Sequence, residues 1–178
     1  ELEDRRQKAV NEVFMAGGVE AVLEFAQAVE SPWRVGLTFG TISANDAQEK
    51  ILPALLESET RSPAQFAGGF VWGMFRERGW QWVDAIDTSQ WTPSQKGQLL
   101  AYLPFTPDTW KRVARLLEED ESPYWSKTNV NPYEAEEGLE RAVDCLVQNG
   151  RPHEAIRCLE RLRDRKQLLD SQQAVRVL

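Results

Sequence analysis

The sequence predicts an all-α fold, built as a right-handed α-solenoid of antiparallel helical hairpins with a repeat of about 30 residues. Three observations lead to this prediction. Prolines that directly follow a helix-capping residue recur at a regular spacing, and apolar residues recur in columns at the same spacing. No segment alternates apolar and polar residues with β-branched side chains over the length of a strand, so strands are not expected.

The regular prolines mark predicted helix starts. A Ser or Thr side chain can accept a hydrogen bond from the first free amides of a helix, and proline at the next position loses nothing, because its N–H would have been unpaired. Spacings of 31, 30, 30 and 29 residues separate the prolines. The residue before each proline is called the cap below, and the pairs are Ser31-Pro32, Ser62-Pro63, Thr92-Pro93, Ser122-Pro123 and Arg151-Pro152.

Apolar residues keep the same phase in each repeat. The column eight residues after the caps holds Phe39, Phe70, Leu100, Val130 and Leu159. The column 21 residues after the first four caps holds Leu52, Val83, Val113 and Val143. A single hairpin cannot bury such stripes by itself, so each repeat is expected to be covered by its neighbours.

Between these markers the chain reads as a series of helices. The predicted spans are 3–16, 18–30, 32–40, 44–57, 63–78, 80–88, 93–103, 107–119, 133–149, 152–166 and a last helix from about 171. Left-handed stops are expected at Gly17-Gly18, Gly79 and Gly150. Thr92 and Gln95 have the spacing of a capping box.

Two segments depart from the regular pattern. Residues 63–78 are apolar nearly all round and contain Gly68, Gly69 and Gly73, which predicts a deeply buried helix with close backbone approach to a neighbour. Residues 122–132 are polar and are interpreted as a loop that replaces the first helix of a repeat.

The aromatic residues of this loop region are candidates for partner binding. Tyr124, Trp125 and Tyr133 could present rigid anchors to another protein. Alternatively they fold back and fill the gap left by the missing helix. Trp80 and Trp82 have the same two interpretations: they line a peptide groove, or they pack between repeats.

Charge and composition limit the functional class. The 178 residues contain 42% hydrophobic and 28% charged residues, as expected for one globular domain over residues 1–178, and both ends suggest a fragment of a longer protein. The net charge of -7 argues against nucleic-acid binding. The longest apolar run, residues 66–75, is too short to cross a membrane, and two cysteines indicate a reducing compartment, so a cytoplasmic protein is expected.

A basic C-terminal helix contrasts with an acidic body. Residues 151–178 contain seven Lys or Arg against four Asp or Glu, which leaves the preceding residues at about -10. Arg157, Arg161 and Arg165 recur at a spacing of four and share one helical face. They could bind an acidic partner, or they could face the acidic body of the next repeat.

No catalytic motif accompanies these features. His153 is the only histidine, and a surface position is expected for it. Cys145 and Cys158 lie on either side of the predicted turn at Asn149-Gly150 and are interpreted as small packing residues. No phosphate loop, dinucleotide fingerprint or zinc signature is present, so no cofactor and no metal are expected.

One segment carries a family resemblance. Residues 139–162, L-E-R-A-V-D-C-L-V-Q-N-G-R-P-H-E-A-I-R-C-L-E-R-L, resemble a tetratricopeptide-type unit in their A-x-x-L, small-residue turn and E-A-I-x-x-L pattern. The period is nearer 30 than the usual length of about 34, and the Trp, Gly and Tyr positions of the first helix are missing. The chain as a whole therefore resembles a degenerate tetratricopeptide- or HEAT-like α-solenoid. It is also similar in style to C-terminal helical arrays of large bacterial multidomain proteins, including signal-transducing NTPases.

The resemblance implies scaffolding or ligand sensing without chemistry. The leading hypothesis is a non-enzymatic helical-repeat domain that binds a protein partner or an adjoining domain of the same chain, with Tyr124, Trp125, Tyr133, Arg157 and Arg161 among the candidate contacts. An alternative is a helical ligand-binding or hydrolytic domain that uses carboxylates and a Trp-lined pocket. A nucleic-acid-binding solenoid is a third hypothesis, which the overall acidity disfavours. The pattern does not predict an oligomeric state.

Overall fold

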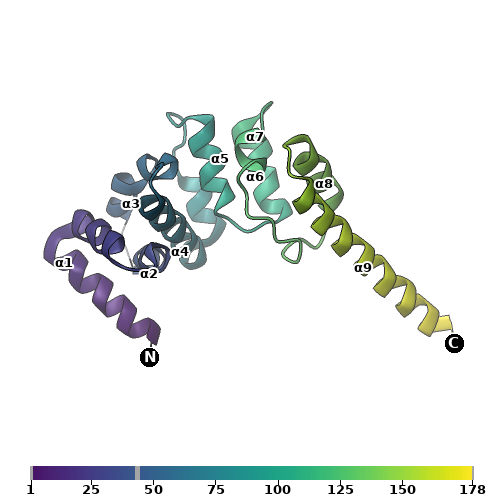
Figure 1. The fold of residues 1–178 in the computed structure, drawn as a ribbon, viewed down its shortest axis with the longest axis horizontal. Coiled ribbons are helices and arrows are strands. Elements are labelled where there is room, and N and C mark those ends of the chain that lie inside the picture. Colours follow the sequence, from purple (N-terminus) through teal and green to yellow (C-terminus); the bar gives the residue numbers. More distant parts are fainter. Residues whose placement is uncertain (1, 43–44, 178) are drawn as a thin grey trace. The chain divides into compact units, whose positions relative to one another are not determined.

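A computed structural model describes residues 2–42 and 45–177, with side chains for residues 2–42 and 47–166. The described residues are helical or irregular and contain no strand, which confirms the all-α class. The sequence predicts one domain, and the structure divides into two compact units along the chain, an N-terminal unit, Glu1–Leu103, and a C-terminal unit, Pro104–Leu178. Figure 1 follows the helices of each unit in order.

The described residues of the N-terminal unit, 2–42 and 45–103, form six helical elements. They are α1 (Leu2–Ala28), α2 (Pro32–Ile42), α3 (Asn45–Ile51), the 3-10 helix η1 (Ala54–Glu57), α4 (Arg61–Ala85) and α5 (Pro93–Ala101). Two of these helices are interrupted at predicted stops, because Gly18 and Gly79 have φ values of 70° and 63°. The predicted capping box is confirmed at the start of α5, where Thr92 Oγ1 accepts from the Gln95 amide at 3.1 Å.

The core of this unit is the packing of α4 against α2 (Figure 1). Phe66 and Phe70 of α4 are fully buried, and both rings contact Phe39 of α2, with centroids 6.3 and 6.0 Å apart. A Cβ atom at Gly69 would overlap the carbonyl oxygen of Trp33, and one at Gly73 would overlap that of Leu37. The predicted close approach of the two backbones is therefore confirmed.

The single helix predicted for residues 44–57 is wrong. The chain instead forms α3, a turn and η1, while residues 43 and 44 lie outside the described residues. The break falls at Pro53, which has no N–H to donate and whose ring collides with the preceding helical turn. The two pieces still deliver Ile51, Leu52 and Leu56 to the core.

The C-terminal unit contains α6 (Pro107–Leu117), α7 (Ser122–Trp125), α8 (Leu139–Gln148) and α9 (Pro152–Val177). Helices α8 and α9 pack against each other as a hairpin (Figure 1). The predicted turn is confirmed: Gly150 has a φ of 71°, and Asn149 closes the end of α8 by donating to the Cys145 carbonyl at 2.8 Å. The predicted break before residue 171 is absent, because α9 is continuous.

Two predictions between residues 122 and 149 are also wrong. Residues 122–125 form the short helix α7 inside the predicted loop, and the helix predicted from residue 133 begins only at Leu139. Residues 133–138 are irregular, and the side chain of Glu134 forms hydrogen bonds outside this segment. The Glu134 carboxylate accepts the Phe105 amide at 2.6 Å and the Asn131 amide group at 2.9 Å, and Gly138 enters α8 with a φ of 76°.

Among the described residues, no helix has both the length and the apolar character needed to cross a membrane.

Candidate functional site

Two of the predicted binding aromatics are core residues of the C-terminal unit. Tyr124 and Trp125 are 0% and 1% exposed. The Trp125 ring packs between Phe105 and Trp110, with centroid distances of 6.2 and 5.9 Å, and the Trp110 indole N–H donates to the Tyr124 hydroxyl at 3.2 Å. Both rings therefore belong to the core of this unit and are not exposed at its surface.

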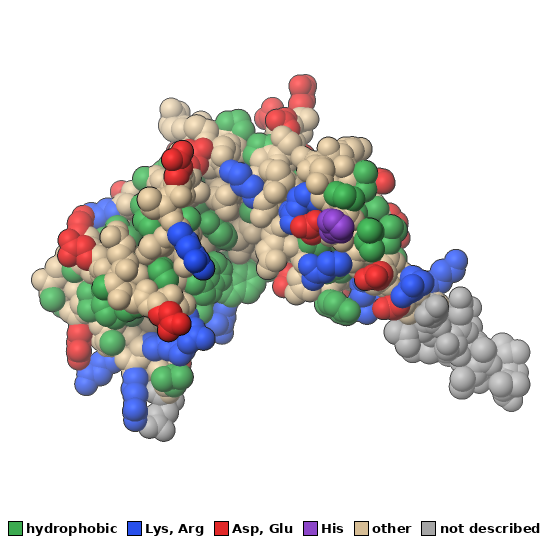
Figure 2. Space-filling view, viewed as in Figure 1, with side chains coloured by type: hydrophobic (Ala, Val, Ile, Leu, Met, Phe, Trp, Pro, Cys, Tyr) green, Lys and Arg blue, Asp and Glu red, His purple; other side chains and the backbone are tan. Residues whose placement is uncertain are grey.

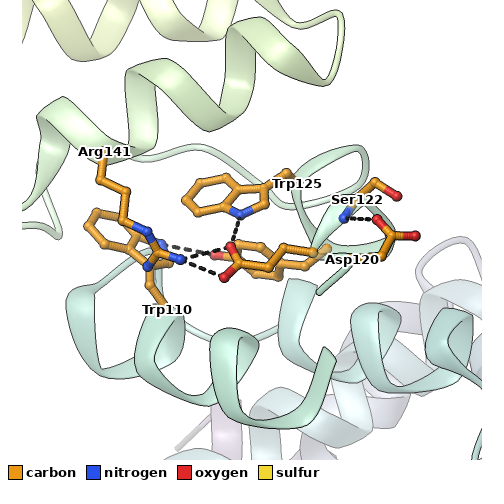
Figure 3. Close-up of polar contacts among 7 residues, drawn as sticks. Trp110, Asp120, Ser122, Trp125 and Arg141 are labelled. Carbon is orange, nitrogen blue, oxygen red and sulfur yellow. Dashed lines mark hydrogen bonds and ion pairs between the residues drawn. The ribbon is translucent and has the colours of Figure 1, made fainter. Parts of the chain in front are cut away.

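A carboxylate in the same cluster has three charged or polar contacts (Figure 3). Glu121 accepts the Trp125 indole N–H at 2.6 Å and two hydrogen bonds from Arg141, at 2.6 and 2.8 Å. The Glu121 side chain is 19% exposed. Glu121 therefore links the start of α7 to α8, and both of its carboxylate oxygens already accept hydrogen bonds.

A polar hollow of about 460 Å³ opens beside this contact. Its lining includes Glu118, Glu119, Asp120 and Cys145 together with the Glu121–Arg141 pair. The Asp120 carboxylate accepts the Ser122 amide at 3.0 Å, and hydrogen bonds from Ser122 lower the pKa of Asp120. A lowered pKa keeps the group ionised, which is the opposite of what a general acid requires at neutral pH.

The irregular loop after α7 is held by arginines of α9 and of the turn before it. Arg151 donates to the carbonyl oxygens of Trp125 at 3.1 Å and Thr128 at 2.7 Å. Arg165 donates to the carbonyl oxygen of Glu136. The Arg161 guanidinium lies 4.9 Å above the ring of Tyr133, as a cation–π contact. Residues 125–136 are therefore fastened to α9 by side chains.

The three arginines that the sequence places on one helical face have different surroundings in the structure. Arg161 and Arg165 contact the loop of their own unit, and Arg157 is exposed. Tyr133, at 71% exposure, is the one candidate of the three loop aromatics that reaches the surface, and the structure brings it together with Arg161.

Trp80 and Trp82 lie in the N-terminal unit, within α4. Trp82 is 7% exposed, and its indole N–H donates to Gln48 at 2.6 Å. Trp80 is partly buried and meets Phe75 edge to face at 4.7 Å. Both rings are engaged in packing within their own unit.

The cysteines and the histidine have no arrangement for nucleophilic chemistry. Cys145 and Cys158 are both free thiols, and burial raises the pKa of each, to about 11 for Cys158. His153 is exposed on the first turn of α9. No group of three or more potential metal ligands occurs among the side chains described for residues 2–42 and 47–166.

Two apolar positions that are buried in α2, α4 and α5 are exposed in α9. In the column eight residues after the caps, Phe39, Phe70 and Leu100 are 0% exposed and Val130 is 3% exposed, but Leu159 is 51% exposed. In the column five residues after the caps, Gly36, Ala67 and Gly97 are buried, Lys127 is exposed, and Ile156 is 51% exposed. The same two positions that are buried in α2, α4 and α5 are therefore uncovered in α9.

One further apolar side chain is exposed on α8. Val147, on the helix that packs against α9, is 55% exposed. Figure 2 shows hydrophobic side chains on the surface beside the single histidine, which lies in the first turn of α9. The surface formed by Ile156 and Leu159 is called the α9 face below.

In the sequence, Val147, Ile156 and Leu159 lie at apolar positions of the two helices on either side of Asn149-Gly150, and the sequence pattern alone does not single them out as a binding surface. The number of apolar positions in this hairpin could have indicated such a surface, because one hairpin cannot bury all of them. Only burial in the folded structure separates the inner positions, such as Leu146 and Cys158, both 0% exposed, from the outer ones.

No protein-family model, curated protein or solved structure matches the chain.

Proposed function

We propose that this chain is a non-enzymatic helical-repeat scaffold, and that the α9 face binds a helical segment of a protein partner or of an adjoining domain. In this proposal the repeats of about 30 residues form a right-handed solenoid, of the degenerate tetratricopeptide- or HEAT-like kind. The observation that carries it is the exposure of Leu159 in a column whose other members are buried.

Internal comparison supports a helix as the covering element. In α2, the residues five and eight positions after the cap, Gly36 and Phe39, are covered by α4: a Cβ at Gly36 would overlap the Phe66 carbonyl, and Phe39 packs on Phe70. Ile156 and Leu159 occupy the corresponding positions of α9. A helix laid against α9 would cover both, at a greater separation than that between α2 and α4, because Ile156 has a large side chain where Gly36 has none.

The energetics favour occupation of this surface. Fully burying an Ile or Leu side chain contributes about 1.5–3 kcal/mol relative to leaving it exposed, and Ile156 and Leu159 each leave about half of their surface in water. Single exposed hydrophobic residues are ordinary, but these two lie three positions apart and so are neighbours on one helix.

Site-specific photo-crosslinking tests the proposal. A photoreactive amino acid is placed at position 156, 159 or 157 of the protein in its native cells, and the crosslinked peptides are identified by mass spectrometry. Positions 156 and 159 should crosslink to one and the same helical segment. Position 157 is the matched control, because Arg157 is exposed on another side of the same helix. Crosslinks that are absent at 156 and 159, or equal at 157, would rule the proposal out.

A further inference from the structure

We propose that the N-terminal unit contains a second binding site, a cavity between α1 and α2 that takes a free apolar α-amino acid such as leucine or phenylalanine. The site lies in a different unit from the α9 face, so the inference goes beyond the proposed function and does not depend on it. It comes from two charges of opposite sign that lie at the entrance of an apolar cavity without pairing.

The cavity forms where the two halves of α1 meet α2. Gly18, with a φ of 70° and a ψ of -157°, interrupts α1, and residues on both sides of it contribute to one lining (Figure 1). Val10 from the first half and Val35 from α2 are 3% and 6% exposed, so the cavity reaches the core. Phe25 from the second half and Val29 also line it and are partly buried. A ligand would therefore bury an apolar group against these four side chains.

The size of the cavity suits a small ligand. Its volume is about 300 Å³, at the small end of ligand sites in proteins. A molecule of about ten non-hydrogen atoms fills this volume, if each atom takes roughly the 30 Å³ of one water molecule in the liquid. Leucine and phenylalanine have this size, whereas nucleotides and long acyl chains are larger.

Two side chains at the entrance carry opposite charges. Glu30 and Arg34 are both exposed, and both line the cavity. They lie at the start of α2, where the Arg34 amide closes a turn by donating to the Ser31 carbonyl at 3.1 Å. Among the described residues, neither Glu30 nor Arg34 has an ion-pair partner. Arg6, the third charged residue of the lining, pairs with Glu3 at 3.4 Å. The lining therefore presents one unpaired charge of each sign.

An α-amino acid matches this arrangement. Its ammonium and carboxylate groups are on one carbon atom, so both can remain at the entrance while the apolar side chain enters the cavity. The Arg34 guanidinium can donate two hydrogen bonds to the carboxylate, and the Glu30 carboxylate can accept from the ammonium. A zwitterion has no net charge, so the net charge of -7 on the chain neither attracts nor repels it.

Ligands with a single charge fit less well. An aromatic or aliphatic acid would pair with Arg34 but bring its carboxylate close to Glu30, and an apolar amine would pair with Glu30 but approach Arg34. Like charges at close range weaken binding. An uncharged apolar molecule would use neither side chain. Of these classes, the zwitterion alone uses both charges.

NMR titration of the 178-residue chain tests the site. Backbone amide shifts are followed during addition of L-phenylalanine and of probes that each lack one feature: 3-phenylpropionate lacks the ammonium, 2-phenylethylamine lacks the carboxylate, and glycine lacks the apolar side chain. L-Phenylalanine should shift the amides of residues 6–10 and 29–38, with a dissociation constant of about 1 mM or lower for a ligand of about ten non-hydrogen atoms. Each singly charged probe should bind about fivefold more weakly, and glycine should cause no shifts.

Substitutions in the lining identify the groups that bind. Glu30→Gln should weaken binding of L-phenylalanine about fivefold and strengthen that of 3-phenylpropionate, whereas Arg34→Gln should weaken L-phenylalanine about fivefold and strengthen 2-phenylethylamine. Ala9→Trp, at an exposed position of the lining, should block the cavity and abolish binding of every probe. Glu24→Gln and Arg61→Gln are the matched controls, because these exposed charges of α1 and α4 lie outside the lining, and they should change binding less than about twofold. The spectra also show whether each variant remains folded.

Each outcome supports or overturns the inference. If 3-phenylpropionate binds the unaltered chain as tightly as L-phenylalanine, Glu30 takes no part and the amino-acid assignment is wrong. If Glu30→Gln and Arg34→Gln act no more strongly than their controls, or if the shifts occur away from the cavity, the site is wrong. The absence of shifts with both L-phenylalanine and L-leucine at about 10 mM, roughly tenfold above the expected dissociation constant, would also overturn it. None of these results concerns the α9 face, so a failure here leaves the proposed function as it stands.

Discussion

Arg141 on α8 and Glu121, the residue before α7, form an ion pair in which one guanidinium nitrogen lies 2.6 and 2.8 Å from the two carboxylate oxygens (Figure 3). The same carboxylate accepts the indole N–H of Trp125 at 2.6 Å. Glu121 therefore connects the aromatic cluster to the α8–α9 hairpin. Through this contact the last regular hairpin is joined to the least regular part of the chain.

Replacing Glu121 should cost more stability than removing a neighbouring charge. Glu121→Ala leaves the buried indole N–H of Trp125 and the Arg141 guanidinium without their acceptor, so we expect a loss of about 2 kcal/mol in the free energy of unfolding. Glu119→Ala, at an exposed position, should change it by less than about 0.5 kcal/mol. Urea unfolding followed by circular dichroism measures both. Equal effects would show that Glu121 contributes nothing beyond surface charge.

Alanine substitution should cost far more stability at Trp125 than at Tyr133. Trp125→Ala empties a fully buried site and should destabilise the protein by about 3–5 kcal/mol. Tyr133→Ala removes a ring that is 71% exposed and should cost about 1 kcal/mol or less, mainly the contact with Arg161. Thermal unfolding distinguishes the two. A stable Trp125→Ala protein would contradict the position of this ring in the core.

Glycine-to-alanine substitutions should reveal the close crossing of α2 and α4. At an ordinary interior position of a helix this substitution stabilises by up to about 1 kcal/mol. At Gly73 the new Cβ would meet the carbonyl of Leu37, so we expect Gly73→Ala to destabilise by about 1–3 kcal/mol in urea unfolding.

Gly79 is the control for that experiment, because a Cβ added there would have no other atom within 4 Å and the residue's φ is 63°. Gly79→Ala should therefore cost about 1–3 kcal/mol through backbone strain alone, and Gly79→Asn should cost as much, since the ψ of -157° lies outside the left-handed helical region that asparagine tolerates. If Gly73→Ala costs no stability, packing does not limit the first position.

Arg151 should control the mobility of the loop after α7. Its guanidinium donates to two backbone carbonyls of the loop and pairs with Glu154 at 2.9 Å. Arg151→Ala leaves those carbonyls unpaired, and we expect faster amide hydrogen exchange in residues 126–131, with a loss of about 1–3 kcal/mol in stability. Arg163→Ala, an exposed arginine further along α9, should leave exchange in the loop unchanged.

Cys158 should be protected from alkylation in the folded protein. Burial raises the pKa of its thiol to about 11, which is above the ordinary value for cysteine, so the reactive thiolate is scarce near pH 8. Iodoacetamide should modify it about 100-fold more slowly than a free cysteine, and the rate should rise as the pH approaches 11. Mass spectrometry of the tryptic peptides measures this, with denatured protein as the reference. Rapid native modification at pH 8 would place Cys158 at the surface.

Sequence alone predicted most of the local structure of this protein. The helical class, the stops at Gly18, Gly79 and Gly150, and the capping box of Thr92 and Gln95 all follow from short-range rules, because a cap or a stop depends on a few adjacent residues. The close packing of α4 was also predictable from its three glycines: Gly69 and Gly73 face the backbone of α2, and Gly68 faces the rings of Trp33 and Tyr102.

The tertiary structure decided what local patterns leave open. Tyr124, Trp125 and Tyr133 have similar sequence surroundings, but two are buried and one is exposed, because burial depends on which distant elements reach them. Glu134 takes an amide 29 residues away and so keeps residues 133–138 out of a helix that their sequence permits. Leu159 matches its column in the sequence and is exposed in the structure, since periodicity identifies an apolar face and only the surrounding elements determine whether that face is covered.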